Sequence, residues 1–307
     1  NWLQMMLSLW RNLMIRRGMI PCSEGLRLHF INNWTTRFFS ALAASSNSQF
    51  QLDLFENVAN REDLRHIPND YARSSLFTAR NKREPRRSLM HEKLFHYNEY
   101  ISILYTGIEL RAEDDEIVWL QILNYGKSVP LGEPFEFSVK DLVRDVDWAR
   151  NGRNYDRVRE CISRLMANSV LALNSKAYGK SGAISLIQNF TAVNDNEGKP
   201  TQYRVWIDPN LIVLFAGNTF TSHSWEIYRN LSPVARRLAD YIESHKQPFP
   251  LSLEKFRQMC GSTDSKTFSW RQTVKKACAE VQTAGIANTA FLSKDDKICC
   301  VRALDKS

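Results

Sequence analysis

Three helix-sized segments within residues 231–285 constrain the fold of this chain more than any other feature. Ser232 and Pro233 predict the start of the first segment. A hydroxyl side chain can cap the unpaired N–H groups of a first helical turn, and proline lacks the N–H that this position leaves unpaired. Pro248 and Pro250 predict that the helix has ended, because proline cannot continue the helical hydrogen-bond ladder.

The second and third segments carry equally local signals. Ser252 predicts the N-cap of a short helix, and Gly261 predicts its end. A longer helix is expected over about residues 267–283, because its apolar residues recur at helical spacing. The residues that this spacing turns inward are Trp270, Val274, Ala277, Cys278 and Val281.

After Gly285, two strand-like runs at 290–292 and 298–301 flank a polar turn. Helix, short helix, polar-faced helix and β-hairpin is the order of a winged helix-turn-helix, whose recognition helix enters the DNA major groove. The alternative is a small packed helical subdomain whose basic residues form only a solvated face.

The charge balance favours a polyanionic partner without requiring one. The 307 residues carry a net charge of +8, with an isoelectric point near 9.2. Residues 231–307 hold 13 Lys and Arg against 8 Asp and Glu, so +5 of this charge lies in the last quarter of the chain.

The same order of elements is predicted earlier in the chain. Asp114 and Asp115 start a helix, 135–137 is a short strand, Ser138 caps a helix, and Asn154 opens a basic-faced helix followed by strands. The predicted fold is therefore α+β, with tandem winged-helix domains after a flexible N-terminal region. The expected boundaries are an N-terminal region at 1–50, a peptide and basic arm at 51–90, and winged-helix domains at 91–228 and 229–307.

The polar faces of the two long helices supply the candidate DNA-binding residues. Arginine can pair with guanine and glutamine with adenine in the major groove. The candidates in the first unit are Arg153, Asn154, Arg157 and Arg164. Those in the second unit are Lys266, Ser269, Arg271, Gln272, Lys275 and Lys276.

A basic segment precedes the first unit. Pro85 breaks any helix there, so we predict a flexible arm that contacts phosphates and single-stranded DNA. The alternative is an ordinary charged linker. The cations assigned to the arm are Arg80, Lys82, Arg83, Arg86 and Arg87.

The N-terminal 17 residues are apolar but interrupted, and too short for a membrane span of roughly 20 residues. They lack the cleavage site of a signal peptide. The alternatives are weak association with a membrane surface, a stretch without function, or an internal start at Met19.

A short motif follows a small, polar linker at 41–48. Its two leucines and its phenylalanine suit an apolar pocket, and its glutamine suits hydrogen bonds. The alternative is the first turn of a helix packed on the body. The motif consists of Gln51, Leu52, Asp53, Leu54 and Phe55.

No catalytic, metal or cofactor site is predicted. The six cysteines contain no C-x-x-C pair, and the six histidines contain no H-x-H or HExxH arrangement. A phosphate-binding Gly-x-x-x-x-Gly-Lys run is also missing. Tyr155 and Tyr241 fit core positions at helical spacing better than nucleophiles. The cysteines are expected to be buried thiols of a cytoplasmic protein.

With these elements placed, the chain from about Gln51 onward resembles the TrfA family of plasmid replication initiators. The runs that carry the resemblance are Leu231-Ser232-Pro233 with Ala235-Arg236-Arg237 and Asp240-Tyr241, Met259-Cys260-Gly261-Ser262, Ile67-Pro68-Asn69-Asp70-Tyr71-Ala72-Arg73-Ser74, Tyr105-Thr106-Gly107 with Glu109-Leu110-Arg111-Ala112, and Val213-Leu214-Phe215-Ala216-Gly217.

The resemblance implies a bacterial, cytoplasmic initiator that binds direct repeats (iterons) at a plasmid origin and helps to open the adjacent AT-rich duplex. It further implies binding of the released single strand, and recruitment of the replicative helicase, the host initiator and the sliding clamp. Monomers would bind iterons, and dimers would limit plasmid copy number. Gln51–Phe55 is similar to the clamp-binding peptide of bacterial replication proteins, with Asp53 where the family has serine.

Two other functions fit parts of the pattern. A winged-helix transcriptional regulator would need neither the peptide nor the basic arm, and it would work as a dimer on an inverted repeat. A rolling-circle nickase is disfavoured because the metal-binding histidines are missing.

Overall fold

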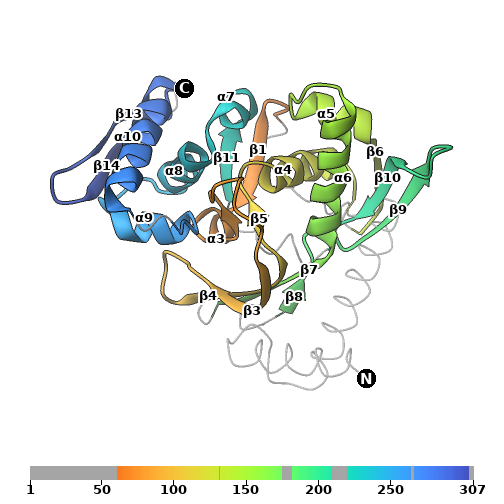
Figure 1. Cartoon of the computed structure of the whole chain (residues 1–307), viewed down its shortest axis with the longest axis horizontal. Coiled ribbons are helices and arrows are strands. Elements are labelled where there is room, and N and C mark those ends of the chain that lie inside the picture. The colour runs from red at the N-terminus through yellow and green to blue at the C-terminus, as the bar shows by residue number, and fades with distance from the viewer. Residues whose placement is uncertain (1–60, 131, 175–181, 209–219, 264–265, 304–307) are drawn as a thin grey trace, which may run out of the picture. The chain divides into compact units, whose positions relative to one another are not determined.

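The computed structural model describes residues 61–303, except 131, 175–181, 209–219 and 264–265 (Figure 1). Helices and strands are mixed along this stretch, and the predicted α+β fold with tandem winged helices is confirmed. The predicted N-terminal region and the motif Gln51–Phe55 lie outside the described residues. No described helix combines the length and the apolar character that crossing a bilayer requires.

The first winged helix contains three helices and a three-stranded antiparallel sheet in the order β6-β10-β9. Asn151 caps its third helix, because the side chain accepts a hydrogen bond from the backbone N–H of Asn154 at 2.9 Å. That helix therefore begins earlier than the predicted start at Asn154. The elements are α4 (Asp115–Gly126), β6 (Phe135–Ser138), α5 (Val139–Asp145), α6 (Gly152–Met166), β9 (Asn189–Asn194) and β10 (Pro200–Trp206).

The second winged helix repeats this plan, with a sheet in the order β12-β14-β13. Ser232 and Ser252 cap its first two helices, as predicted. Gly261 has a φ of 59°, and an added Cβ would lie 2.7 Å from Thr78, so glycine is required at this helix end. The elements are α8 (Pro233–Glu243), β12 (Leu251–Ser252), α9 (Leu253–Met259), α10 (Thr267–Thr283), β13 (Ala287–Leu292) and β14 (Lys297–Arg302).

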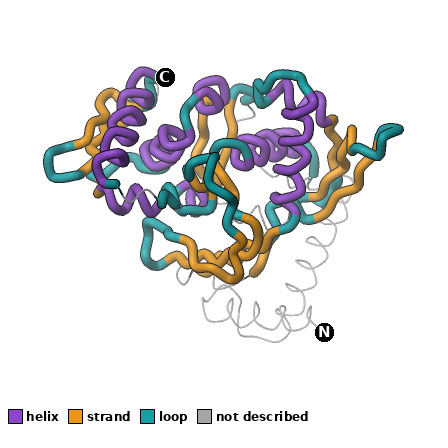
Figure 2. Tube along the Cα trace, viewed as in Figure 1, coloured by secondary structure: helices purple, strands orange, loops and turns teal. Residues whose placement is uncertain are grey.

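The predicted inward face of α10 is confirmed, because all five of its residues are buried. This helix therefore packs one face on its own core and leaves the opposite face exposed. Figure 2 shows each unit as a group of helices beside a small sheet.

A four-stranded antiparallel sheet adjoins the first winged helix, in the order β3-β4-β7-β8. Although glycine often marks a turn, β4 runs through Thr106 and Gly107. Gly107 pairs with Leu89 on one side and with Asn168 on the other, so it stays within the ladder. The strands are β3 (Ser88–Leu94), β4 (Ile101–Ile108), β7 (Asn168–Asn174) and β8 (Gly182–Ile184).

Residues before 91 also belong to the folded body. The strand β1 (Leu64–Pro68) pairs antiparallel with β11 (Phe220–Ser224), and each is followed by a short helix, α3 (Asn69–Ala72) or α7 (Trp225–Asn230). The short β2 (Phe77–Thr78) pairs with β5 (Leu110–Arg111) in parallel.

A buried ionic cluster joins the two winged helices. Arg237 of α8 is fully buried. Its guanidinium donates to Glu116 of α4 at 2.9 Å and to Asp240 at 2.6 Å. It also donates to the carbonyl oxygens of Ala72 and Ser74, each at 2.7 Å. One side chain thus ties together the first unit, the second unit and the segment that precedes both.

His223 of β11 extends this cluster. Its Nε2 lies 2.9 Å from an Asp240 carboxylate oxygen, and its Nδ1 bonds Glu243. Burial alone would lower the pKa of His223, but the Glu243 and Asp240 carboxylates raise it to about 10. The buried ring is therefore an imidazolium at neutral pH.

Candidate nucleic-acid interface

The outward face of α10 is exposed and basic. Trp270 and Val274 fix the orientation of this helix by packing into the core. The sequence from Thr267 to Ala279 contains no acidic residue. Among the predicted DNA-binding residues of this unit, the exposed ones are Lys266, Ser269, Gln272, Lys275 and Lys276.

Glu280, the acidic residue of α10, accepts hydrogen bonds from the backbone and the hydroxyl group of Ser232, the latter at 2.7 Å. This carboxylate is thereby engaged with the start of α8. The positive charge of Lys275 and Lys276 therefore remains available to an anionic partner.

Arg271 is placed differently from its neighbours on α10. It is half-buried, and its guanidinium pairs with Asp296 in the turn between β13 and β14. The pair connects the recognition helix to the wing. A base or phosphate would have to compete with Asp296 for Arg271.

In α6, two predicted DNA-binding arginines are already paired with acids at the start of α4. Arg164 lies 2.9 Å from Asp115 and 3.7 Å from Asp114. Arg157 lies 3.5 Å from Glu113 and 3.6 Å from Asp114, and its guanidinium is 4.2 Å from the ring centroid of Trp148. Sequence reasoning missed these acids as partners: the run Glu113-Asp114-Asp115 was visible, but the sequence does not show that the start of α4 lies against α6.

The other two candidates of α6 differ from each other. Arg153 is exposed at the start of the helix. Asn154 is half-buried and donates its side-chain amide to the carbonyl oxygen of Ala149 at 2.8 Å. Both line an open groove of mixed charge, together with Lys82 and Glu113. Arg153 is thus the α6 candidate best placed to meet DNA.

Asp114, Asp115 and a further acid, Glu109, engage the predicted basic arm. Arg86 pairs with Asp114 at 2.8 Å and with Asp115 at 2.7 Å. Arg80 pairs with Glu109 at 2.7 Å, and its side chain is only 8% exposed. A flexible arm is therefore wrong for this segment, because carboxylates further along the chain hold Arg80 and Arg86 against the folded body.

Three cations of the segment face solvent. Arg83 and Arg87 are exposed, and Lys82 is exposed although its Nζ lies 3.6 Å from Glu113. Their contact with phosphates remains a prediction.

Asp114, Asp115 and Cys161 bring three donor atoms within 4.8 Å of one another. Guanidinium groups of Arg86 and Arg164 already contact these carboxylates. Burial raises the pKa of the Cys161 thiol well above its usual value, which disfavours the thiolate that a metal needs. The donor set therefore suits arginine rather than a metal ion.

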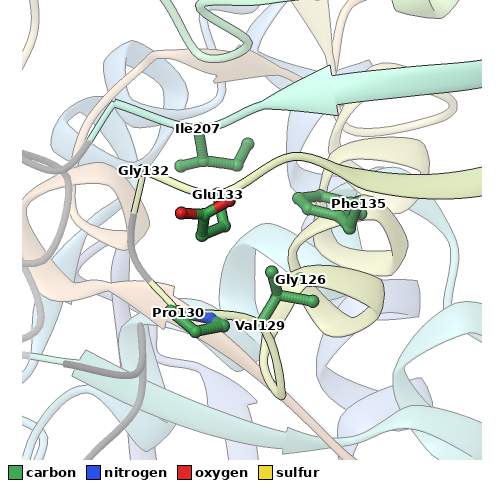
Figure 3. A pocket seen from close by; sticks show the side chains of 7 residues that line it. All are labelled: Gly126, Val129, Pro130, Gly132, Glu133, Phe135 and Ile207. Atoms are coloured by element: carbon green, nitrogen blue, oxygen red, sulfur yellow. The ribbon is translucent and has the colours of Figure 1, made fainter. Parts of the chain in front are cut away.

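A small hollow lies between the end of α4 and the start of β6 (Figure 3). Phe135 and Ile207 line it with Val129 and Pro130, and Glu133 is its charged residue. Without a cation, this hollow offers nothing to a nucleic acid.

Comparison with known proteins adds sequence and fold relatives. The protein family described as TrfA protein matches residues 41–302. The plasmid replication initiator protein TrfA of Escherichia coli is 44% identical over 254 residues, which cover 83% of this chain and 66% of that protein. This chain thus spans slightly less than two thirds of the length of that relative.

Two crystal structures of RctB fragments resemble the fold. SeMet derivatives of domains 2 and 3 align over 70% of this chain and 85% of the RctB chain, with a TM-score of 0.52 and 11% identity. A second structure of domains 2–3 aligns over 74% and 95%, with a TM-score of 0.49 and 12% identity. At this identity, the first match supports the fold alone.

Proposed function

This chain belongs to the TrfA family, and we propose that it is a plasmid replication initiator that binds directly repeated iterons in a plasmid origin. The observation that carries the proposal is the outward face of α10. It holds exposed Gln272, Lys275 and Lys276 on the helix that a winged helix presents to the major groove.

Within this proposal, α10 reads bases and the start of α6 makes a second contact. Gln272 is suited to adenine, and the lysines to guanine or to phosphate. Arg153 is the exposed cation of α6, whereas Arg157 and Arg164 must exchange acid partners before they can bind DNA. We therefore assign most of the base reading to the second winged helix.

Opening of the AT-rich duplex would draw on binding energy rather than on catalysis. Several initiators on tandem sites would bend the DNA, and the released single strand would meet exposed cations. Lys82, Arg83 and Arg87 are the cations we assign to this step. The motif Gln51–Phe55 would dock in the sliding clamp, and the replicative helicase and host initiator would join the complex.

A salt-titrated binding assay tests this proposal. The purified chain is measured against a direct-repeat origin fragment and a scrambled fragment of the same length and composition. We expect preference for the repeats at physiological salt, with a linear fall of log affinity against log salt. Lys275→Ala should weaken binding, whereas Lys246→Ala, an exposed lysine beyond the end of α8, should not.

Equal binding of both fragments, vanishing steeply with salt, would mean that charge alone attracts DNA. The proposal of iteron recognition would then be lost.

A further inference from the structure

An exposed aromatic side chain lies on the outward face of α10, opposite its buried stripe. Phe268 lies in the first turn of this helix and is 75% exposed. The other large apolar residues of the helix, Trp270, Val274 and Val281, are buried. Phe268 therefore contributes little to the core, and a ring left in water gains none of the stabilisation that burial provides.

Helical spacing places Phe268 on the same stripe as two proposed base readers. Gln272 and Lys275 follow it by four and seven positions, which stacks the three side chains along one face. All three are exposed, and the stripe lies opposite the buried one. Residues near the N-terminus of a recognition helix are those that contact base edges.

We propose that Phe268 contacts the 5-methyl groups of thymine within the iterons and so contributes sequence preference. The inference rests on the proposed function and names a part of the DNA that the polar residues cannot read. Base edges in the major groove otherwise present hydrogen-bond donors and acceptors, and the thymine methyl is the apolar group that a phenyl ring can cover.

Uracil-containing DNA isolates this contact, because deoxyuridine differs from thymidine only by the missing methyl group. Two versions of the direct-repeat origin fragment are prepared, one with thymine and one with uracil throughout. We expect the wild-type chain to bind the uracil fragment about fourfold more weakly for each methyl group that Phe268 covers. Phe268→Ala should bind the thymine fragment more weakly and lose most of this discrimination.

A matched control is available elsewhere in the same domain. Phe249 is 69% exposed and lies in the loop between α8 and β12, so Phe249→Ala should keep the wild-type discrimination against uracil. Thermal unfolding of both variants checks that each remains folded.

The inference is overturned if Phe268→Ala discriminates against uracil as strongly as the wild-type chain, or if the wild-type chain does not discriminate at all. The proposed function survives either result, provided that the wild-type chain still prefers the repeats to the scrambled fragment. Loss of that preference would overturn both.

Discussion

Replacing Arg237 by methionine should strongly destabilise the folded chain. Methionine keeps much of the side-chain length but removes every donor of the guanidinium, which contacts Glu116, Asp240 and two carbonyl oxygens. Asp240 keeps two other partners, the hydroxyl of Tyr228 at 3.0 Å and His223 at 2.9 Å. Glu116 is therefore the acid left without its compensating charge.

Removing one partner of a buried ion pair lowers the free energy of unfolding by roughly 3–5 kcal/mol. Burial, and then Asp240, raise the pKa of Glu116 to about 7. Without Arg237 the Glu116 carboxyl should take up a proton more readily, and a protonated carboxyl needs no compensating charge. The free energy of unfolding lost on Arg237→Met should therefore be larger at pH 8 than at pH 6. Urea unfolding followed by circular dichroism measures both values.

Two further variants test the reasoning. Glu116→Gln in the Arg237→Met background should recover part of the loss, because no buried charge then lacks a partner. Arg153→Met removes an exposed arginine and should change the free energy of unfolding by less than about 0.5 kcal/mol. A loss below about 1 kcal/mol for Arg237→Met, or a loss that does not shrink at pH 6, would refute the proposed role of the ion pair.

Three other predictions concern separate parts of the chain. The pKa of His223 is raised to about 10, from about 6.5 in an unfolded chain. The stabilisation that charged His223 gives the folded chain is therefore complete below pH 6.5 and is lost as the pH rises through 10. The free energy of unfolding should thus fall from pH 7 to 10, and His223→Gln should flatten that fall. If Arg271 leaves Asp296 to read a base, Arg271→Ala should weaken iteron binding by about 1–3 kcal/mol, and unchanged affinity for both repeat and random DNA would remove Arg271 from the interface. Leu54→Ala and Phe55→Ala should each abolish capture by purified sliding clamp, and undiminished capture would exclude the motif.

The elements that sequence reasoning placed correctly depend on local chemistry. Ser232 and Ser252 cap helices through hydrogen bonds that span three residues. Gly261 and Gly285 adopt positive φ values that other residues rarely tolerate. Such signals need no knowledge of the remaining chain, and in the first unit Ser138 caps α5 in the same way.

The failures involve partners that are distant in sequence. The charge of Arg237 suggests an exposed residue, but Glu116, its partner, lies 121 positions away. The charged surroundings of Arg80 and the nearby Pro85 predict a flexible arm, whereas Glu109, 29 positions later, holds Arg80 in place. A cation whose neutralising acid comes from another element cannot be recognised from its neighbours alone.

The candidate site shows the same limit. The outward residues of α10 were found because its buried stripe fixes the opposite face. The spacing also places Phe268 beside Gln272 and Lys275, but an apolar residue on its own predicts a core position, so the sequence does not indicate an exposed ring. The acids that pair with Arg157 could be seen in the sequence, but not their distance from it.

The contrast between the two recognition helices bears on how the chain would engage an origin. A phosphate that approaches Arg157 or Arg164 must first displace a carboxylate, so the energy gained is only the difference between two ion pairs. Lys275 and Lys276 are exposed on α10, whose acid, Glu280, is bound to Ser232. Within the part of the chain that the structure describes, these lysines have no carboxylate to give up, and they gain the full attraction to the DNA phosphates. Binding through α10 would therefore come first. On random DNA, the acids at the start of α4 would keep Arg157 and Arg164 of α6 paired. Only a site that also binds α10 would hold the duplex close enough for these arginines to exchange a carboxylate for a phosphate.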